Sequence, residues 1–406
     1  MTRKDTIRTS MAIKQSKHII PVQHSTPVLI SNGMEQALPF NTGDDFSIVA
    51  KEDGKITEIN EQTNIVVVEY KKPLSDGSRY QAIDTSKRVV KNGAGGFYLA
   101  NQMVHNLKVG QTVKKNDILA YDKNFYSNDN DGVRFNIGSL EKIAVFSNAA
   151  TMEDSAFVTQ KLTHDIATKI TMAKPVTLGK NANVDYIVKI GDKVKVGDEL
   201  IRFESSFKDD SLNKFLDELR TDLNEEIKSL GKKPITSKYT GEIVDIKIYS
   251  TVDTEELSPS LQKLVKEHYA RINKRKNVLN KYDKSDAKYK MGIYQDEPTS
   301  KVDSPDGKVK GEIVGEGVLI QIFVEYTDIA GVGDKIAFFT ALKGIIGDVV
   351  EPGLEPFTLN EPDEEISAFV APGAVLARMT PSILLTLFGN KALVGLKKRL
   401  KEIYEK

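Results

Sequence analysis

Two lysines bracket the least ordinary stretch of the sequence, GDKIAFFTALKG, which covers residues 333–344. Lys335 and Lys343 enclose an apolar run, and each has a glycine near it, Gly333 before the first lysine and Gly344 after the second. Ammonium groups that converge on one place suit a phosphate. An extended run would hold these two roughly 27 Å apart, so this chemistry requires the run to fold back. Spacing alone also fits an ordinary core strand with one solvated lysine at each end.

Two adjacent carboxylates, Glu153 and Asp154, lie in TMEDS (residues 151–155) after the apolar segment KIAVFSNAA. Such a pair can contact a divalent metal directly or through water. Successive residues of a strand point to opposite faces, so both carboxylates reach one site only if the chain turns there. The alternative is the acidic first turn of a helix formed by the following AFVTQKLTHDIATKI.

Two isolated arginines complete the candidate set. Arg8 lies in DTIRTS and Arg378 in LARMTPS, each at a junction of polar and apolar residues. The fork of a guanidinium can hold phosphate oxygens. An ordinary surface arginine explains either position equally simply.

Most of the chain that must position these residues predicts short strands. Residues 46–70 divide into three β-rich pieces separated by turn residues. The pattern G-x-x-V-x-x-[GN]-D-x-[IL] occurs within residues 109–122 and again within 190–204, and predicts hairpins of a small barrel-sandwich. Lipoyl and biotin carriers use similar hairpins, but neither copy has a modifiable lysine at a tight turn. Residues 317–329 predict a strand that leads into the lysine stretch.

Apolar residues spaced by threes and fours predict helices over residues 209–229 and 257–282, the second as an exposed arm or hairpin. The C-terminal run KALVGLKKRLKEIYEK is an amphipathic basic helix. Its apolar stripe needs cover, which favours docking on a partner subunit over lying on a membrane surface. The predicted fold is therefore mixed and β-dominated (α+β), with a helical insertion near residues 205–290.

Composition excludes several classes of protein. The 406 residues suffice for two or three domains, and 57 basic residues balance 57 acidic ones. A free-standing DNA binder usually has a basic excess, so any contact with nucleic acid must come from a local patch. With no cysteine there are no disulfides and no Cys-ligated zinc. No apolar run approaches the length of a membrane span. We expect a soluble, cytoplasmic protein.

The order of the motifs is more informative than any one of them. Along residues 5–390 the chain reads DTIR, NGMEQAL, VKKNDILAYD, TMEDSAFVTQKL, VKVGDELI, GEIVDIKIY, GDKIAFFTALKG and ARMTPSILLTLFGN. This collinear series resembles the C-terminal half of the second-largest (β) subunit of multisubunit DNA-directed RNA polymerases.

The resemblance implies a double-psi β-barrel and a barrel-sandwich hybrid motif, with a flap-like α/β insertion. The implied regions are 1–40 (a hybrid- and NTP-proximal segment entering the barrel), 41–150 (barrel-sandwich hybrid), 151–175 and 306–385 (barrel halves), 176–305 (flap-like insertion with a helical arm) and 386–406 (amphipathic docking helix).

The resemblance also implies roles for single residues. Lys335 and Lys343 match the active-site lysines that contact the α-phosphate of the incoming nucleotide and the RNA 3′ end. Glu153 and Asp154 match an acidic pair near the second catalytic Mg²⁺, which they reach through water. Arg8 and Arg378 match NTP-binding positions of the family. Lys14, Lys17 and His18 match positions that bind the RNA–DNA hybrid.

The departures from the family pattern are informative too. The G-R-H-G-N between the family's lysines is Phe338-Phe339-Thr340-Ala341-Leu342 here, and Ile7 replaces an asparagine. The acidic loop N-A-D-F-D-G-D, which holds the first magnesium on the family's largest subunit, has no counterpart. Met1 falls just before a motif that lies mid-chain in bacteria. A naturally split β subunit is therefore implied, most similar to those of giant tailed bacteriophages.

The implied partners are an N-terminal β fragment, β′-like subunit fragments and a promoter-specificity subunit, together with DNA template, RNA transcript and NTPs, and no membrane. The chain alone should be inactive, and its place is the cytoplasm of the infected bacterial host or the virion. The alternative is a non-catalytic assembly or structural protein on a degenerate polymerase barrel, motivated by the lost R-H-G-N. An independent nucleotide-binding or carrier domain is a third alternative.

Overall fold

The computed structural model describes residues 7, 10–12, 20–29, 33–75, 77–91, 98–129, 132–136, 138–149, 151–204, 232–282, 308–309, 312–338, 342–379 and 381–405. The predicted helix over 209–229 lies outside these residues. So do four of the candidate site residues, Arg8, Lys14, Lys17 and His18.

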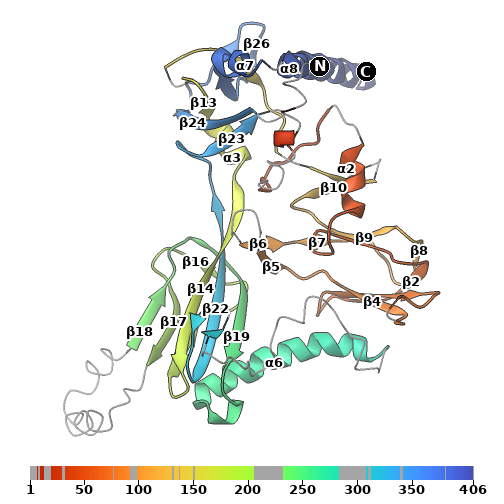
Figure 1. The fold of residues 1–406 in the computed structure, drawn as a ribbon, viewed down its shortest axis with the longest axis vertical. Coiled ribbons are helices and arrows are strands. Elements are labelled where there is room, and N and C mark those ends of the chain that lie inside the picture. The colour runs from red at the N-terminus through yellow and green to blue at the C-terminus, as the bar shows by residue number, and fades with distance from the viewer. Residues whose placement is uncertain are drawn as a thin grey trace, which may run out of the picture.

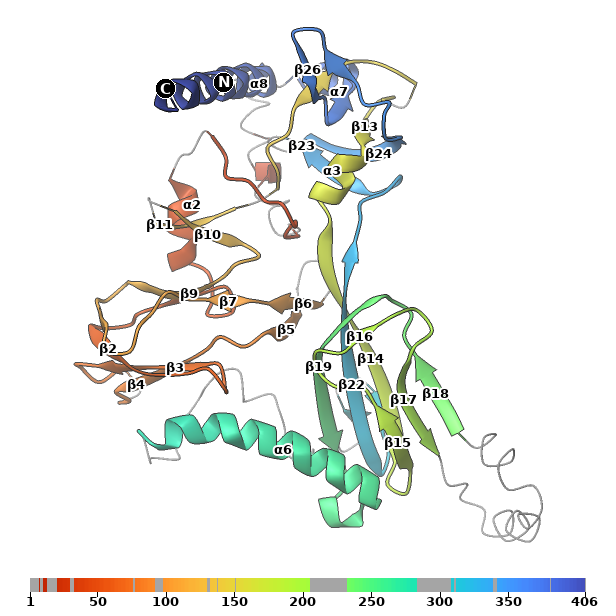
Figure 2. The ribbon, with the colours of Figure 1, turned by 180° about the vertical axis from the view of Figure 1, so that it is seen from behind.

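Strands dominate the described part of the chain, and a few helices accompany them (Figures 1 and 2). The predicted mixed, β-dominated α+β class is therefore confirmed at this level.

The N-terminal third is built from small antiparallel sheets. The three strands predicted within residues 46–70 are all present. The elements are α2 (Met34–Ala37), η1 (Leu38–Phe40), β1 (Ser47–Val49), β2 (Gly54–Asn60), β3 (Ile65–Tyr70), β4 (Tyr80–Asp84), β7 (Met103–Val104), β8 (Thr112–Val113), β9 (Ile118–Asp122), β10 (Tyr126–Asp129) and β11 (Gly132–Phe135). Their strand orders are β4-β3-β2-β8, β1-β9-β7 and β10-β11.

A long antiparallel ribbon runs through the centre of the molecule. β14 and β22 pair along their whole lengths, and they are the two central strands of a sheet of order β16-β19-β22-β14-β6-β5. Its strands are β5 (Arg88–Lys91), β6 (Tyr98–Asn101), β14 (Thr168–Gly179), β16 (Lys193–Val194), β19 (Gly241–Ser250) and β22 (Gly317–Asp328). The near-continuous apolar run of β22 follows from its burial on both faces.

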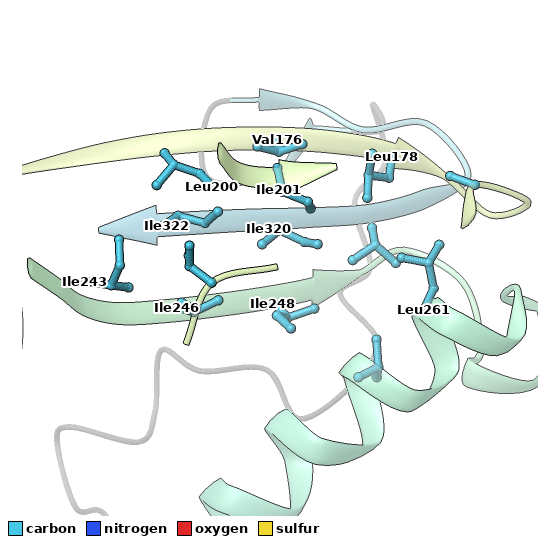
Figure 3. Packing of buried hydrophobic residues seen from close by; sticks show 14 of the residues in the cluster. Val176, Leu178, Leu200, Ile201, Ile243, Ile246, Ile248, Leu261, Ile320 and Ile322 are labelled. Atoms are coloured by element: carbon cyan, nitrogen blue, oxygen red, sulfur yellow. The ribbon is translucent and has the colours of Figure 1, made fainter. Parts of the chain in front are cut away.

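The largest core cluster lies between this sheet and a second layer of order β15-β17-β18. Figure 3 shows Val176 and Leu178 of β14 facing Ile201, with Ile320 and Ile322 of β22 beside them. The strands of the second layer are β15 (Asn183–Ile187), β17 (Glu199–Glu204) and β18 (Lys232–Thr236).

The apolar stripe predicted within residues 257–282 forms one helix, α6 (Pro259–Asn280), preceded by η2 (Thr254–Glu256). The prediction of an exposed arm or hairpin is wrong, because the stripe is buried. Its members that are at most 4% exposed are Leu261, Val265, Ile272 and Val278. The first of these joins the central core and the last packs against β3, so α6 links two sheets (Figures 1 and 2).

A mixed sheet at one end of the ribbon contains both candidate motifs. Its order is β12-β27-β13-β24-β23. The strands are β12 (Ile143–Val145), β13 (Ser155–Thr159), β23 (Lys335–Phe338), β24 (Leu342–Val350) and β27 (Ala368–Val370). β13 runs parallel to β24 and antiparallel to β27, so segments nearly 200 residues apart alternate across the sheet.

The remaining elements lie in two places, because the paired strands at residues 308–309 and 312–313 lie beside β14 and the others accompany the mixed sheet. They are α3 (Gln160–Asp165), β20 (Lys308–Val309), β21 (Glu312–Ile313), β25 (Phe357–Thr358), β26 (Glu361–Glu365), α7 (Pro372–Arg378) and α8 (Pro381–Tyr404). Within the described residues, none of the helices combines the length and the hydropathy needed to cross a bilayer.

One turn recurs at three places and explains the repeated sequence pattern. Gly110, Gly191 and Gly333 all have φ near +90°, a conformation that favours glycine. Each donates its N–H to a carbonyl of a neighbouring strand, at Ile56, Ile243 and Ile346 respectively. The N–H of that same isoleucine returns a hydrogen bond to the residue after the glycine. The turn before β23 is thus a third copy of the turn in the two predicted hairpins.

Candidate functional site

The two candidate lysines lie on one antiparallel hairpin. In the β23–β24 register, Ala337 is opposite Lys343 and Lys335 is opposite Ile345. Directly paired residues share a face, as do residues two apart, so both lysines project from one face, and both are exposed. Diagonal neighbours on such a face lie roughly 7–8 Å apart. The run therefore folds back, as phosphate chemistry requires.

The opposite face of the hairpin explains why the intervening sequence is apolar. It packs into the core of the mixed sheet and consists of Ile336, Phe338, Leu342 and Ile346. Alternation along the strands thus places cations outward and aliphatic and aromatic side chains inward. Residues 339–341, which include Phe339, lie outside the described residues.

The acidic pair lies in a turn that enters a strand. Glu153 has φ of +50°, in the left-handed region, and Ser155 begins β13. The alternative prediction, an acidic first turn of a helix, is wrong because α3 starts only at Gln160. The turn is what lets adjacent carboxylates leave the alternation of a strand.

Backbone contact fixes the acidic turn against the lysine hairpin. The carbonyl of Asp154 accepts a hydrogen bond of 3.0 Å from the N–H of Ile345. At Gly344 an added Cβ would lie 2.4 Å from that carbonyl oxygen. Only glycine allows so close an approach of the two chains, so the glycine beside Lys343 has a structural cause.

Arg378, the last residue of α7, joins the same place. Its Nη2 donates to Oδ1 of Asp154 at 2.7 Å and to the carbonyl of Lys343 at 3.3 Å. The arginine side chain is only 14% exposed, whereas that of Asp154 is 56% exposed. Nη1 is buried and has no hydrogen-bond partner among the described residues. A charge-assisted hydrogen bond of this length is a strong one, so the pair holds cation and acid in register.

A small cavity lies between these groups. Its volume is about 10 Å³, and its polar lining residues are Asp154, Ser155, Lys343 and Arg378. That is room for about one water molecule. A phosphate group does not fit into this cavity as it stands.

The residues present suit a magnesium ion that is shared with other ligands. Within the described part of the chain, no three or more His, Asp or Glu side chains are grouped so that they could hold a metal. Magnesium in nucleotide sites typically takes one or two carboxylates, with waters and substrate phosphates as its other ligands. Glu153 and Asp154 are the carboxylates that would supply such ligands, and Asp154 is already paired with Arg378.

The structure thus brings Lys335, Lys343, Asp154 and Arg378 to one end of the molecule. Sequence reasoning named all four and missed the contacts between them. The ion pair of Asp154 with Arg378 joins residues 224 positions apart, a relation that spacing cannot reveal. The glycine at 344 was the available signal, because a glycine in a strand often marks a close backbone approach.

Comparison with models of known protein families gives no match, and comparison with curated proteins gives none either.

Proposed function

We propose that the chain is a fragment of a split β subunit of a multisubunit DNA-directed RNA polymerase, where it supplies phosphate-binding cations for template-directed ribonucleotide transfer. One observation supports this best. Two lysines share a face of the β23–β24 hairpin, and Asp154 and Arg378 meet at its edge. These residues come from three distant segments that the family resemblance assigns to one catalytic centre.

Nucleotidyl transfer requires positive charge that is fixed next to the reacting phosphate. Nucleotidyl transfer passes through a transition state whose charge is spread over phosphate oxygens, and catalysis is mostly positioning and neutralisation. Bound magnesium ions would neutralise charge at the attacking and leaving oxygens. Lys335 and Lys343 would hold the α-phosphate and the RNA 3′ end. Arg8 and Arg378 would hold the triphosphate tail.

The buried side of the hairpin supports this role, because it fixes the backbone that carries the two lysines. A preorganised charge needs no rearrangement during the reaction, which is the main advantage of such sites over water. Glu153 and Asp154 would place the second magnesium through water. Lys14, Lys17 and His18 would line the RNA–DNA hybrid.

The finer fold assignment belongs to the same proposal. We assign the mixed sheet to a double-psi β-barrel, because its strands alternate between residues 143–159 and 335–370. The recurring glycine turns suit barrel-sandwich hairpins. The layer β15-β17-β18 with α6 corresponds to the flap-like insertion.

The partners follow from what the chain would need. They are an N-terminal β fragment, β′-like fragments with the first-magnesium carboxylates, and a promoter-specificity subunit. Template DNA, transcript and NTPs are the ligands, and the setting is the cytoplasm of an infected bacterium or the virion.

Alanine substitution of each lysine tests the catalytic role. With Lys335→Ala or Lys343→Ala, we expect normal assembly with the partner chains and NTP incorporation reduced roughly 100- to 1000-fold, the scale for one preorganised donor. The measurement is elongation from a preformed RNA–DNA scaffold by the purified complex.

Lys55→Ala is the matched control, because Lys55 is an exposed strand lysine in the separate β2–β4 sheet. It should leave elongation unchanged. Normal elongation by an assembled Lys335→Ala or Lys343→Ala complex would contradict the proposed role.

A non-catalytic assembly protein is the second candidate, and two observations favour it. Asp154 already forms an ion pair with Arg378, so this guanidinium is not free for a phosphate. In addition, Phe338 and Leu342 stand where the family has the first and last residues of its G-R-H-G-N run. Copurified partners that make no RNA on any primed scaffold would favour this candidate.

A further inference from the structure

One face of helix α8 packs against the rest of the chain, and the opposite face is exposed. On one face, Ile383 is buried and Leu387 packs against the core of the mixed sheet. Farther along the same face, Lys391 and Lys398 pair with Glu361 and Glu364 of β26. This face is therefore already occupied by the chain itself.

The other face is apolar and uncovered in the described structure. Five large side chains on it are between 53% and 73% exposed, namely Leu385, Phe388, Leu396, Leu400 and Ile403. From the first to the last, the stripe extends about 27 Å along the helix. A contiguous apolar stripe of this length marks an interaction surface.

The spacing of this face is that of a helix–helix seam. Residues 385, 389, 392, 396, 399 and 403 follow intervals of four and three, the heptad rule for core positions. Gly389 and Ala392 lie mid-seam and let a partner backbone come close. Arg399 occupies one seam position, is exposed, and needs an acid opposite it when it is covered.

We infer that this face, hereafter the α8 seam, docks an amphipathic helix of a different polypeptide that places an acidic side chain opposite Arg399. A second copy of the chain does not fit. A parallel pair would bring two Arg399 residues together. An antiparallel pair that overlaps along the whole helix would place Arg399 against residues 381–396, which contain no acid.

A membrane surface fits less well than a helix. Surface-seeking helices use free lysines and arginines beside the apolar face to reach anionic headgroups. Here Lys391 and Lys398 are bound to glutamates on the docked face, and Lys401 pairs with Glu405. Within the described residues, the basic side chains of α8 that are exposed and without an ion pair are Lys397 and Arg399. That is a small charge for binding anionic headgroups. The inference concerns α8 alone and holds whether or not the assembly synthesises RNA.

Site-specific photocrosslinking in the native cell tests the α8 seam. A photoreactive phenylalanine analogue would replace Leu396 in the tagged full-length chain, and crosslinked peptides would be sequenced. We expect one product, with a segment of another polypeptide that has heptad-spaced apolar residues and an acid within a turn of the crosslink. The same analogue at Lys397, exposed but off the seam, is the matched control and should give far less of it.

Charge reversal makes the test specific. Arg399→Glu should lower the yield on the order of tenfold or more, since tenfold corresponds to the lower end of the coupling energies of close interfacial charge pairs. Exchange of the partner's acid for lysine should restore it. Circular dichroism of the Arg399→Glu chain checks that the helix is intact. Crosslinks to a second copy, to lipid or to no discrete protein would overturn the inference, as would a yield indifferent to Arg399→Glu.

Discussion

Lys343 contributes two separate groups to the candidate site. Its ammonium lies on the exposed face of the hairpin, while its backbone carbonyl accepts a hydrogen bond from Arg378. Asp154 is used in the same double way, with its carboxylate on Arg378 and its carbonyl on the N–H of Ile345. The positions of cation and acid are therefore coupled through the backbone, and a change at either one moves both.

Gly344→Ala is the sharpest single-residue test of that coupling. The new Cβ would lie 2.4 Å from the Asp154 carbonyl, so the acidic turn must move away from β24. We expect a loss of stability of about 1–3 kcal/mol, the usual cost of overpacking, and a fall in RNA synthesis by the assembled complex. Thermal unfolding and scaffold elongation measure the two effects.

Gly373→Ala is the matched control, because Gly373 lies in α7 with nothing within 4 Å of an added Cβ. It should be neutral or stabilising, since alanine favours a helix. Equal behaviour of the two variants would show that the close approach at Gly344 is unimportant.

At the scale of elements, α6 packs against two different sheets, the central one and the β4-β3-β2-β8 sheet. Its N-terminal half packs on the central core, and its C-terminal half reaches β3 and β4. Arg275 forms an ion pair with Asp84, which is fully buried at the end of β4. The helix is long and charged, as predicted, yet its apolar stripe and Arg275 attach it to both sheets.

Arg275→Ala should strongly lower the free energy of unfolding. It would leave the buried Asp84 carboxylate without a charged partner, which typically costs about 3–5 kcal/mol. Denaturant unfolding measures the loss. Lys281→Ala is the control, since Lys281 is exposed and an ion pair of this kind is worth about 1 kcal/mol or less. Equal losses in the two variants would rule out a structural role for the buried pair.

The packing of α6 also predicts a dependence on pH. Burial, with help from Arg271 and Lys247, lowers the pKa of His268 to about 4. The unfolded chain has the ordinary pKa of 6.5, so below that pH it binds the proton first. Stability is therefore full above pH 6.5 and falls as the pH drops toward about 4, by up to about 3 kcal/mol.

His268→Gln should flatten the stability profile between pH 6.5 and pH 4, because glutamine does not titrate. Urea midpoints across that range, compared with the unaltered chain, measure the effect. An unchanged slope would mean that other groups cause the acid sensitivity.

At the scale of the whole molecule, the β14–β22 ribbon joins the site to the remote layers. β14 follows α3 directly, and β22 leads into the turn before β23 (Figure 1). The described residues offer only a pair of carboxylates at the site. We therefore expect the purified chain to incorporate no NTP on a primed scaffold, and activity to appear only with the partner chains present. RNA synthesis by the chain alone would contradict the proposal.

Local rules were enough for much of the fold. The β-rich composition of residues 317–329 predicted β22, apolar residues three and four positions apart predicted α6, and the Gly/Asn-Asp pairs predicted turns. Those features depend on neighbours a few residues away. The exposed arm was wrong because the sequence shows an apolar stripe but does not say which surface will cover it.

The sequence by itself determined which residues can do chemistry at this site and that glycines must surround them, because residue type and backbone freedom are local properties. Only the tertiary structure decided that Lys335 and Lys343 share a face, that Asp154 holds Arg378, and that Gly344 lies against a carbonyl. Those relations join segments up to 224 residues apart. They arise from the parallel pairing of β13 with β24, which burial of the common core selects and no spacing in the sequence encodes.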